Sequence, residues 1–286
     1  MLREQFEQEI SCFYGDIAYL GNSDVQKLDL YLPKASERPY PLIVVIHGGA
    51  FRFGDKDSWD GVAPLHGLAR GYAVASVNYR LSAEALFPAN VLDVRAAIRF
   101  LRANAARFGL DAGRFCVWGP SAGGYLSAMA GVAASADAFV HEEGDMPVSC
   151  AVQAAVDWFG PINFDKMDGQ FAARHAPGDI HNAPDSPESL LLGDDITHRP
   201  DLVARANPET YITPDTPPFL IQHGSDDLIL PFEQSVHFAD CLRKANVPVE
   251  LDILPGAGHG GPQFDAQENV ARVFAFLDRH LHVERG

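Results

Sequence analysis

Residues 115–125 run Phe-Cys-Val-Trp-Gly-Pro-Ser-Ala-Gly-Gly-Tyr, and this stretch decides how the rest of the chain is interpreted. The apolar run stops at Gly119, Ser121 follows two residues later, and two more glycines lead into a segment of helical character. A strand, a sharp turn with a serine at its tip and a helix make up the G-x-S-x-G pattern, which exposes a reactive hydroxyl. The flanking residues are small because strand and helix pass close on either side. The stretch predicts a nucleophilic serine at position 121, and a plain strand-to-helix connection is the alternative that the motif alone leaves open.

The length and charge of the chain exclude several classes of protein. Its 286 residues are enough for one α/β domain with a full core. The 38 Asp and Glu outnumber the 22 Lys and Arg and give a net charge of −16, which repels nucleic acid and anionic membranes. The first ten residues are polar and acidic, unlike a secretory signal, although a leader lost by processing would leave no trace. The four scattered cysteines have no metal-ligand spacing and are expected to be free thiols, which favours a cytoplasmic location.

Strand and helix patterns alternate between residues 41 and 131, which predicts parallel β-α-β units. Residues 41–47 form a β-branched run typical of a strand buried on both faces, and residues 17–20 and 28–32 predict an antiparallel pair before it. Periodicity is lost over about residues 162–217, an insertion that we expect to form a small cap or lid, with a plain surface excursion as the alternative. The expected fold is therefore a single α/β domain over residues 1–286, with a mostly parallel, doubly wound sheet.

Three candidate catalytic groups each follow the C-terminal end of an expected strand: Ser121, an acid at Asp226 or Asp227, and His259. Open parallel sheets build their sites at that edge. In this arrangement the histidine takes the serine proton and the acid orients the imidazole. A His-Gly-Gly turn at residues 47–49 follows another strand and is suited to present backbone N–H groups to an oxyanion. Glycines needed only for a turn are the alternative.

Taken in order, these motifs resemble the α/β-hydrolase fold of carboxylesterases in the esterase/lipase group, which includes bacterial feruloyl-esterase-like enzymes. The resemblance spans residues 13–277 and rests on His47-Gly-Gly-Ala-Phe51, Asn78-Tyr-Arg-Leu81, Gly119-Pro-Ser-Ala-Gly-Gly124, His223-Gly-Ser-Asp-Asp227 and Gly258-His-Gly260.

The resemblance also implies roles for individual residues. It places the acid at Asp227 and leaves Asp226 as a solvated or capping loop residue. It implies oxyanion donors at the backbone amides of Gly49, Ala50 and Ala122, while the preceding glycine shapes the turn. Many relatives carry a third glycine where this chain has Ala50, and alanine can serve there if its φ is negative.

These groups predict a serine carboxylesterase that hydrolyses small esters, either short-chain acyl or aryl and hydroxycinnamoyl, through an acyl-enzyme. Neither an organic cofactor nor a metal is required, and the histidines at 175–181 and 280–282 are expected to be solvated because they lack zinc-site spacing. The segment Asp157-Trp-Phe159 is equally placed to line the pocket or to fill the core. An amide-cleaving hydrolase such as an arylformamidase or peptidase, and a non-catalytic small-molecule-binding protein on the same fold, stay open. The physiological ester and any homo-oligomer also stay open.

Overall fold

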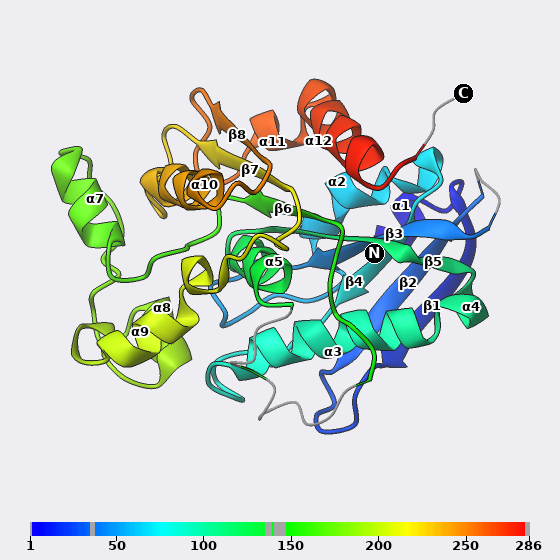
Figure 1. Ribbon diagram of the computed structural model, residues 1–286, viewed down its shortest axis with the longest axis horizontal. Coiled ribbons are helices and arrows are strands. Elements are labelled where there is room, and N and C mark those ends of the chain that lie inside the picture. Colours follow the sequence, from blue (N-terminus) through cyan, green and yellow to red (C-terminus); the bar gives the residue numbers. More distant parts are fainter. Residues whose placement is uncertain (1, 35–37, 135–138, 140–146, 284–286) are drawn as a thin grey trace.

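A computed structural model describes residues 2–34, 38–134, 139 and 147–283, and a sheet of eight strands forms its centre (Figure 1). The strands run in the order β1-β2-β4-β3-β5-β6-β7-β8. β2 pairs antiparallel with both β1 and β4, and the pairs from β4 to β8 are parallel, which confirms the expected sheet. Their bounds are β1 Ile10–Ala18, β2 Lys27–Pro33, β3 Tyr40–Ile46, β4 Ala73–Val77, β5 Leu110–Pro120, β6 Ala154–Trp158, β7 Phe219–Gly224 and β8 Val249–Leu254.

Helices cover both faces of this sheet (Figure 1). One face carries α3 (Ala89–Ala103), α5 (Ala122–Val132) and α10 (Glu233–Lys244), and the other carries α2 (Val62–Leu65) and α12 (Gln267–His280). Short helices α1 (Leu2–Gln5), α4 (Ala105–Phe108) and α11 (Pro262–Asp265) complete the flanks. None of the helices in the described parts of the chain is long and apolar enough to cross a lipid bilayer.

The apolar strand β3 explains why the sheet needs a layer on each side. Its side chains alternate between two hydrophobic clusters, with Leu42 and Val44 in the cluster under α3 and α5, and Ile43 and Val45 in the cluster under α12. All seven of its residues are buried. A continuous apolar run therefore specifies a central strand, since alternate positions of a strand face opposite sides.

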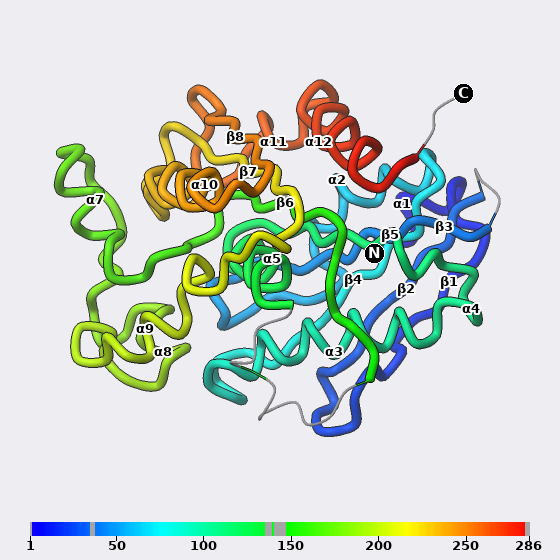
Figure 2. Tube along the Cα trace, in the orientation of Figure 1, coloured from blue at the N-terminus to red at the C-terminus, as the bar shows by residue number. Residues whose placement is uncertain are grey.

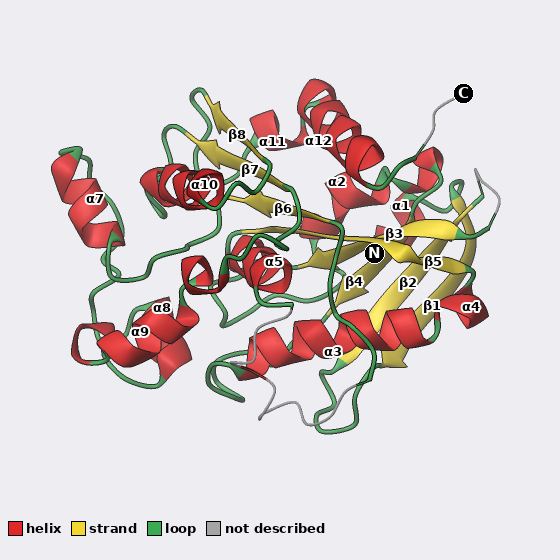
Figure 3. Cartoon of the chain, viewed as in Figure 1, coloured by secondary structure: helices red, strands yellow, loops and turns green. Residues whose placement is uncertain are grey.

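The expected insertion joins β6 to β7, and Figure 2 traces it as a single excursion of the chain away from the sheet. It contains three short helices, α7 (Met167–Ala173), α8 (Pro187–Leu192) and α9 (Pro200–Ala206), separated mainly by loops and 3₁₀ turns (Figure 3). The helix α8 has a capping signal that the sequence contains, because Ser186 accepts a hydrogen bond from the amide of Ser189 and Pro187 occupies the first turn. The loop before α8 lines the same cavity as Ser121, which follows β5, and His259, which follows β8.

Candidate active site

The turn between β5 and α5 holds Ser121 in a conformation that few residues adopt. Its φ is 55° and its ψ is −122°, and its amide donates a hydrogen bond to the carbonyl of Trp158 on β6 at 2.8 Å. The flanking glycines are required by close approach: a Cβ on Gly123 would lie 2.0 Å from the carbonyl oxygen of Ile46. One on Gly119 would lie 2.5 Å from that same oxygen. The small residues on both sides thus let β3, β5 and α5 meet closely enough to expose the serine.

The structure brings the three residues singled out above, Ser121, His259 and Asp227, into one hydrogen-bonded chain. The Ser121 hydroxyl lies 2.9 Å from Nε2 of His259, and Nδ1 of His259 lies 2.8 Å from Oδ2 of Asp227. The Asp227 side chain is fully buried, whereas that of His259 keeps 17% of its surface exposed. A hydroxyl, an imidazole and a carboxylate in this order can activate the hydroxyl as a nucleophile.

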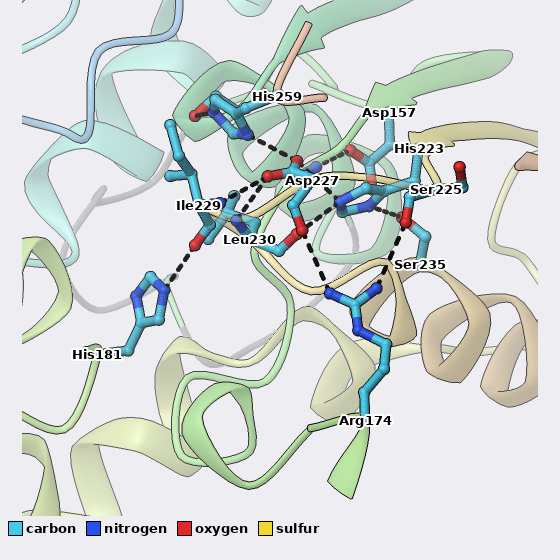
Figure 4. A network of polar contacts seen from close by, with 12 residues as sticks. Asp157, Arg174, His181, His223, Ser225, Asp227, Ile229, Leu230, Ser235 and His259 are labelled. Atoms are coloured by element: carbon cyan, nitrogen blue, oxygen red, sulfur yellow. Dashed lines mark hydrogen bonds and ion pairs between the residues drawn. The ribbon is translucent and has the colours of Figure 1, made fainter. Parts of the chain in front are cut away.

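Asp227 is held by its own loop after β7, by His223 on β7 and by His259 (Figure 4). Its Oδ1 accepts hydrogen bonds from the amides of Ile229 and Leu230 at 2.8 and 2.9 Å, and its Oδ2 also lies 3.1 Å from Nε2 of His223. Burial by itself would raise the pKa of Asp227, but the hydrogen bonds from His223 and His259 outweigh it and hold the pKa well below its usual range. The carboxylate therefore stays ionised.

The neighbouring acid is oriented differently. Asp226 is exposed and accepts a hydrogen bond from the Ser225 hydroxyl at 2.6 Å, so it belongs to the loop surface. Sequence alone left Asp226 and Asp227 as neighbours to choose between; the geometry joins only Asp227 to His259.

The turn after β3 lies across from Ser121. The amide of Gly48 donates to Oδ2 of Asp60 at 2.8 Å and is therefore occupied, whereas Gly49, Ala50 and Ala122 line the same cavity as the serine. Ala122 is the first residue of α5, so its amide has no acceptor within the helix. This arrangement leaves three backbone amides near the hydroxyl that an oxyanion could use.

The expected backbone conformation of Ala50 in this turn was wrong. Alanine was expected to serve at position 50 with a negative φ, but the φ of Ala50 is +52°, and that of Gly49 is +111°. The left-handed region costs a residue with a Cβ about 1–2 kcal/mol. The turn needs that conformation to pass over the serine, so the chain accepts strain at Ala50 where glycine would have none.

The layer beneath the turn is stabilised by an aromatic and polar contact. Nδ1 of His47 donates to the Gly48 carbonyl at 2.7 Å, the rings of His47 and Tyr79 stack with centroids 4.4 Å apart, and the Tyr79 hydroxyl donates to the His47 carbonyl at 3.0 Å. His47 thus hydrogen-bonds the backbone of its own loop.

A cavity of about 590 Å³ opens above the Ser121 hydroxyl. Its walls are mostly apolar, and two large aromatic side chains at its mouth are well exposed, Trp59 at 60% and Phe53 at 63%. Of the segment Asp157-Trp-Phe159, only Phe159 reaches the cavity, where its ring lies 4.8 Å from that of His259. The remaining two are core residues: Asp157 is fully buried and Trp158 donates to Gln222 at 2.7 Å.

Two residues of the insertion that sequence reasoning missed hydrogen-bond to the loop that contains Asp227 (Figure 4). Arg174, just after α7, donates to the carbonyls of Ser225 and Asp227 at 3.5 and 3.2 Å. His181 was expected to be solvated, which is wrong: it is 3% exposed and its Nε2 donates to the Ile229 carbonyl at 2.8 Å. No local pattern could have found either contact, since each joins residues far apart in the chain.

The partner of His181 is Glu188 on α8, whose Oε2 lies 3.1 Å from Nδ1. Burial alone would lower the pKa of His181, but the hydrogen bond and charge of Glu188, together with the Ile229 carbonyl, outweigh it and raise the pKa. The two side chains line the cavity, so the insertion contributes a buried, hydrogen-bonded His–Glu pair to its wall.

The sheet order and the Ser121–His259–Asp227 geometry define a chain with the α/β-hydrolase fold. The BD-FAE family model matches residues 28–242, about three quarters of the chain, so the chain belongs to the BD-FAE family.

Individual relatives agree with this assignment. The chain is 32% identical over 272 residues to the esterase LipC of Mycobacterium tuberculosis, covering 93% of this chain and 64% of LipC. It is 30% identical to the carboxylesterase NlhH of the same organism, covering 82% of that protein. A solved structure described as a truncated form of a carbohydrate esterase from gut microbiota superposes with a TM-score of 0.83 at 31% identity, covering 96% of this chain and 98% of that one. The chain spans only about half to two thirds of the length of several curated relatives that it matches.

Proposed function

We propose that this protein is a serine carboxylesterase that hydrolyses small carboxylic esters, with Ser121 as nucleophile, His259 as general base and Asp227 as the acid that orients it. The observation that carries the proposal is the hydrogen-bonded chain Ser121–His259–Asp227 at the floor of an apolar cavity. The esterase relatives support it, since the named relatives LipC and NlhH are an esterase and a carboxylesterase.

In the proposed reaction, His259 removes the proton from Ser121 as the hydroxyl attacks the ester carbonyl. The ionised Asp227 fixes the imidazole tautomer through Nδ1 and stabilises the imidazolium that forms. The protonated His259 then gives its proton to the leaving alcohol, and water, activated by the same base, hydrolyses the acyl-enzyme.

The proposed oxyanion donors are the backbone amides of Gly49, Ala50 and Ala122, which line the cavity beside Ser121. Preorganised N–H groups stabilise the tetrahedral intermediate because they need no reorganisation when the charge develops, and each such donor is worth about 3–4 kcal/mol in known cases. The N-terminus of α5 adds a favourable dipole at the same position.

The cavity supports a proposal on the substrate class. A volume of about 590 Å³ is typical of small-molecule sites. The exposed aromatic rings of Trp59 and Phe53 at its mouth would cover an aryl or hydroxycinnamoyl group, or the apolar face of a sugar alcohol. A carbohydrate leaving group is favoured additionally by the carbohydrate esterase among the structural relatives. We propose the insertion at residues 162–217 as the cap that sets this choice, because His181 and Glu188 line the cavity from it.

The charge and the cysteines of the chain bear on its partner and its location. A net charge of −16 favours a small neutral or cationic ester over nucleic acid as the partner. The cysteines Cys12, Cys116, Cys150 and Cys241 are all free, which supports the proposal of a reducing, cytoplasmic location.

The test is hydrolysis of p-nitrophenyl acetate, butyrate and octanoate and of methyl ferulate by the protein and by Ser121→Ala. We expect turnover of at least one ester by the wild type and a loss of several orders of magnitude in kcat for the variant. Ser127→Ala is the matched control, since Ser127 lies in the helix α5 that follows Ser121, is buried, and its hydroxyl has no hydrogen-bond partner among the described residues. It should keep wild-type rates.

The alternatives give different results. Turnover of anilides or formamides without ester turnover would favour the amide-cleaving hydrolase. A folded protein that turns over none of these substrates, and whose ligand binding Ser121→Ala leaves intact, would favour a binding protein. If Ser121→Ala with His259→Ala is far slower than either single variant, the two residues do not act as one unit and the proposed mechanism is wrong.

A further inference from the structure

A second group of reactive side chains lies outside the cavity, where the end of the insertion meets α10. Glu209 lies in the 3₁₀ turn Pro208–Tyr211, and His237 and Cys241 lie on α10. The two helical residues are four positions apart and so share one face of the helix, one turn above the other. The insertion thus delivers a carboxylate onto a helix face that already presents an imidazole and a thiol.

The distances within this group match those between ligands of one metal ion. One donor atom from each residue lies within 4.8 Å of the others. Sγ of Cys241 is 3.6 Å from Nε2 of His237 and 4.0 Å from Oε2 of Glu209, and that oxygen also contacts Nε2 of His237 directly. Zinc bonds of about 2.3 Å to sulfur and 2.0–2.1 Å to nitrogen, at tetrahedral angles, set the S···N separation at about 3.6 Å. To bind such an ion, Oε2 of Glu209 would move away from Nε2 of His237 and closer to Sγ of Cys241, and the thiol and the ligating imidazole nitrogen would give up their protons.

The same contacts exclude a cysteine–histidine–acid catalytic relay, which these three residue types also suggest. In a cysteine–histidine–acid relay, the thiol and the carboxylate contact different nitrogens of the ring. Here both the Cys241 thiol and the Glu209 carboxylate converge on Nε2 of His237. Convergence of three donors on one point is the arrangement that a metal ion needs and a proton relay cannot use.

The surroundings of the group have the features of a metal site. Nδ2 of Asn163 donates to Oε1 of Glu209 at 2.6 Å, which orients the carboxylate and leaves Oε2 facing His237 and Cys241. The side chains of His237 and Glu209 are 42% and 23% exposed, so an ion has an entry path and water can occupy a fourth position. Thiolate and imidazole ligands select zinc-class cations over magnesium or calcium, which prefer oxygen.

We propose that Glu209, His237 and Cys241 form a binding site for a zinc-class divalent cation, with Asn163 as the residue that orients the carboxylate. A bound ion would join the last turn of the insertion to α10. The site shares no residue with the cavity around Ser121, so it does not depend on the proposed esterase function.

The experiment is calorimetric titration of Zn²⁺ into the chelator-treated full chain, with Mg²⁺ as a second titrant. We expect one Zn²⁺ per chain, no measurable Mg²⁺ binding, and an increase in Tm at saturating Zn²⁺. Cys241→Ser and His237→Ala should each weaken binding by more than about tenfold, and Asn163→Ala by about tenfold. Cys12→Ser is the matched control because Cys12 is the other half-buried free cysteine, and it should leave binding unchanged.

Substitution with Co²⁺ tests the thiolate directly. A thiolate-to-cobalt charge-transfer band should appear in the near ultraviolet and be absent in Cys241→Ser, which is close in size to the wild type and is checked for folding by circular dichroism. Zn²⁺ binding that Cys241→Ser and His237→Ala leave unaltered would assign the ion to other histidines and overturn the proposal. So would the absence of any Zn²⁺ binding, or a Co²⁺ complex without the thiolate band.

Discussion

Replacing Asp157 with Asn should stabilise this protein increasingly as the pH rises. Asp157 is fully buried next to the turn that holds Ser121. Its Oδ1 accepts a hydrogen bond from the Gly160 amide at 2.8 Å, and its Oδ2 has no hydrogen-bond partner among the described residues. Burial raises the pKa of Asp157 from 3.8 to about 7, and the Gly160 hydrogen bond offsets only part of that effect. The folded chain therefore holds this proton much more tightly than the unfolded chain does.

The magnitude follows from the linkage between proton binding and folding. Stability from the protonated carboxyl is complete below about pH 4 and is lost as the pH rises through about 7, in total roughly 4 kcal/mol. An asparagine does not ionise, so its packing cost is independent of pH. Between about pH 5.5 and about pH 8.5, the difference in free energy of unfolding between Asp157→Asn and the wild type should move by about 2 kcal/mol in favour of the variant.

Urea unfolding of both proteins at several pH values measures this difference directly. The contributions of all other titrating groups to the pH dependence cancel, because both proteins contain them. Asp215→Asn is the matched control: Asp215 is exposed, so the same change of charge should leave the difference nearly constant. An Asp157→Asn difference that does not vary with pH, or that moves in favour of the wild type as the pH rises, would refute the reasoning.

Three further predictions concern the geometry around the site. Ala50→Gly should raise the free energy of unfolding by about 1 kcal/mol, because φ is +52° there. The control Ala271→Gly, on the exposed side of α12, should lower it by about 1 kcal/mol. If urea unfolding shows that both variants are less stable than the wild type, the strain at Ala50 is contradicted. Gly123→Ala should cost about 3 kcal/mol and abolish ester turnover, since its Cβ would lie 2.0 Å from the Ile46 carbonyl oxygen. Gly21→Ala, with nothing within 4 Å of its Cβ, should be tolerated. An active Gly123→Ala protein would show that the turn around Ser121 can open to admit the methyl group. The double variant His181→Gln, Glu188→Gln should destabilise more at about pH 6 than at about pH 9. The stability from the pair is complete below the ordinary histidine pKa of about 6.5 and is lost as the pH rises through the raised pKa that His181 has in the folded protein; an equal effect at both pH values would argue against a charged pair.

Much of the fold and part of the site could be predicted because the signals lie in short stretches. The run at β3 is apolar at every position, which only a strand buried on both faces tolerates, and the glycines around Ser121 mark a turn where no side chain fits. The insertion gave weaker signals, since its helices are only six or seven residues long and no periodic pattern develops over that length. His181, which was expected in solvent because its spacing does not fit a zinc site, lies in this insertion and is buried.

By itself the sequence determined the strand–helix alternation, the position of Ser121 in a sharp turn and the order of serine, acid and histidine along the chain, because periodicity and turn chemistry are local properties of the chain. Only the tertiary structure decided that Ala50 has a positive φ, that His181 meets the carbonyl of Ile229 48 residues away, and that Glu209 meets Cys241 32 residues away. These features depend on how separate segments approach one another across the ends of the strands. No stretch of residues encodes such an approach until the sheet and its two helical layers have fixed the distances between them.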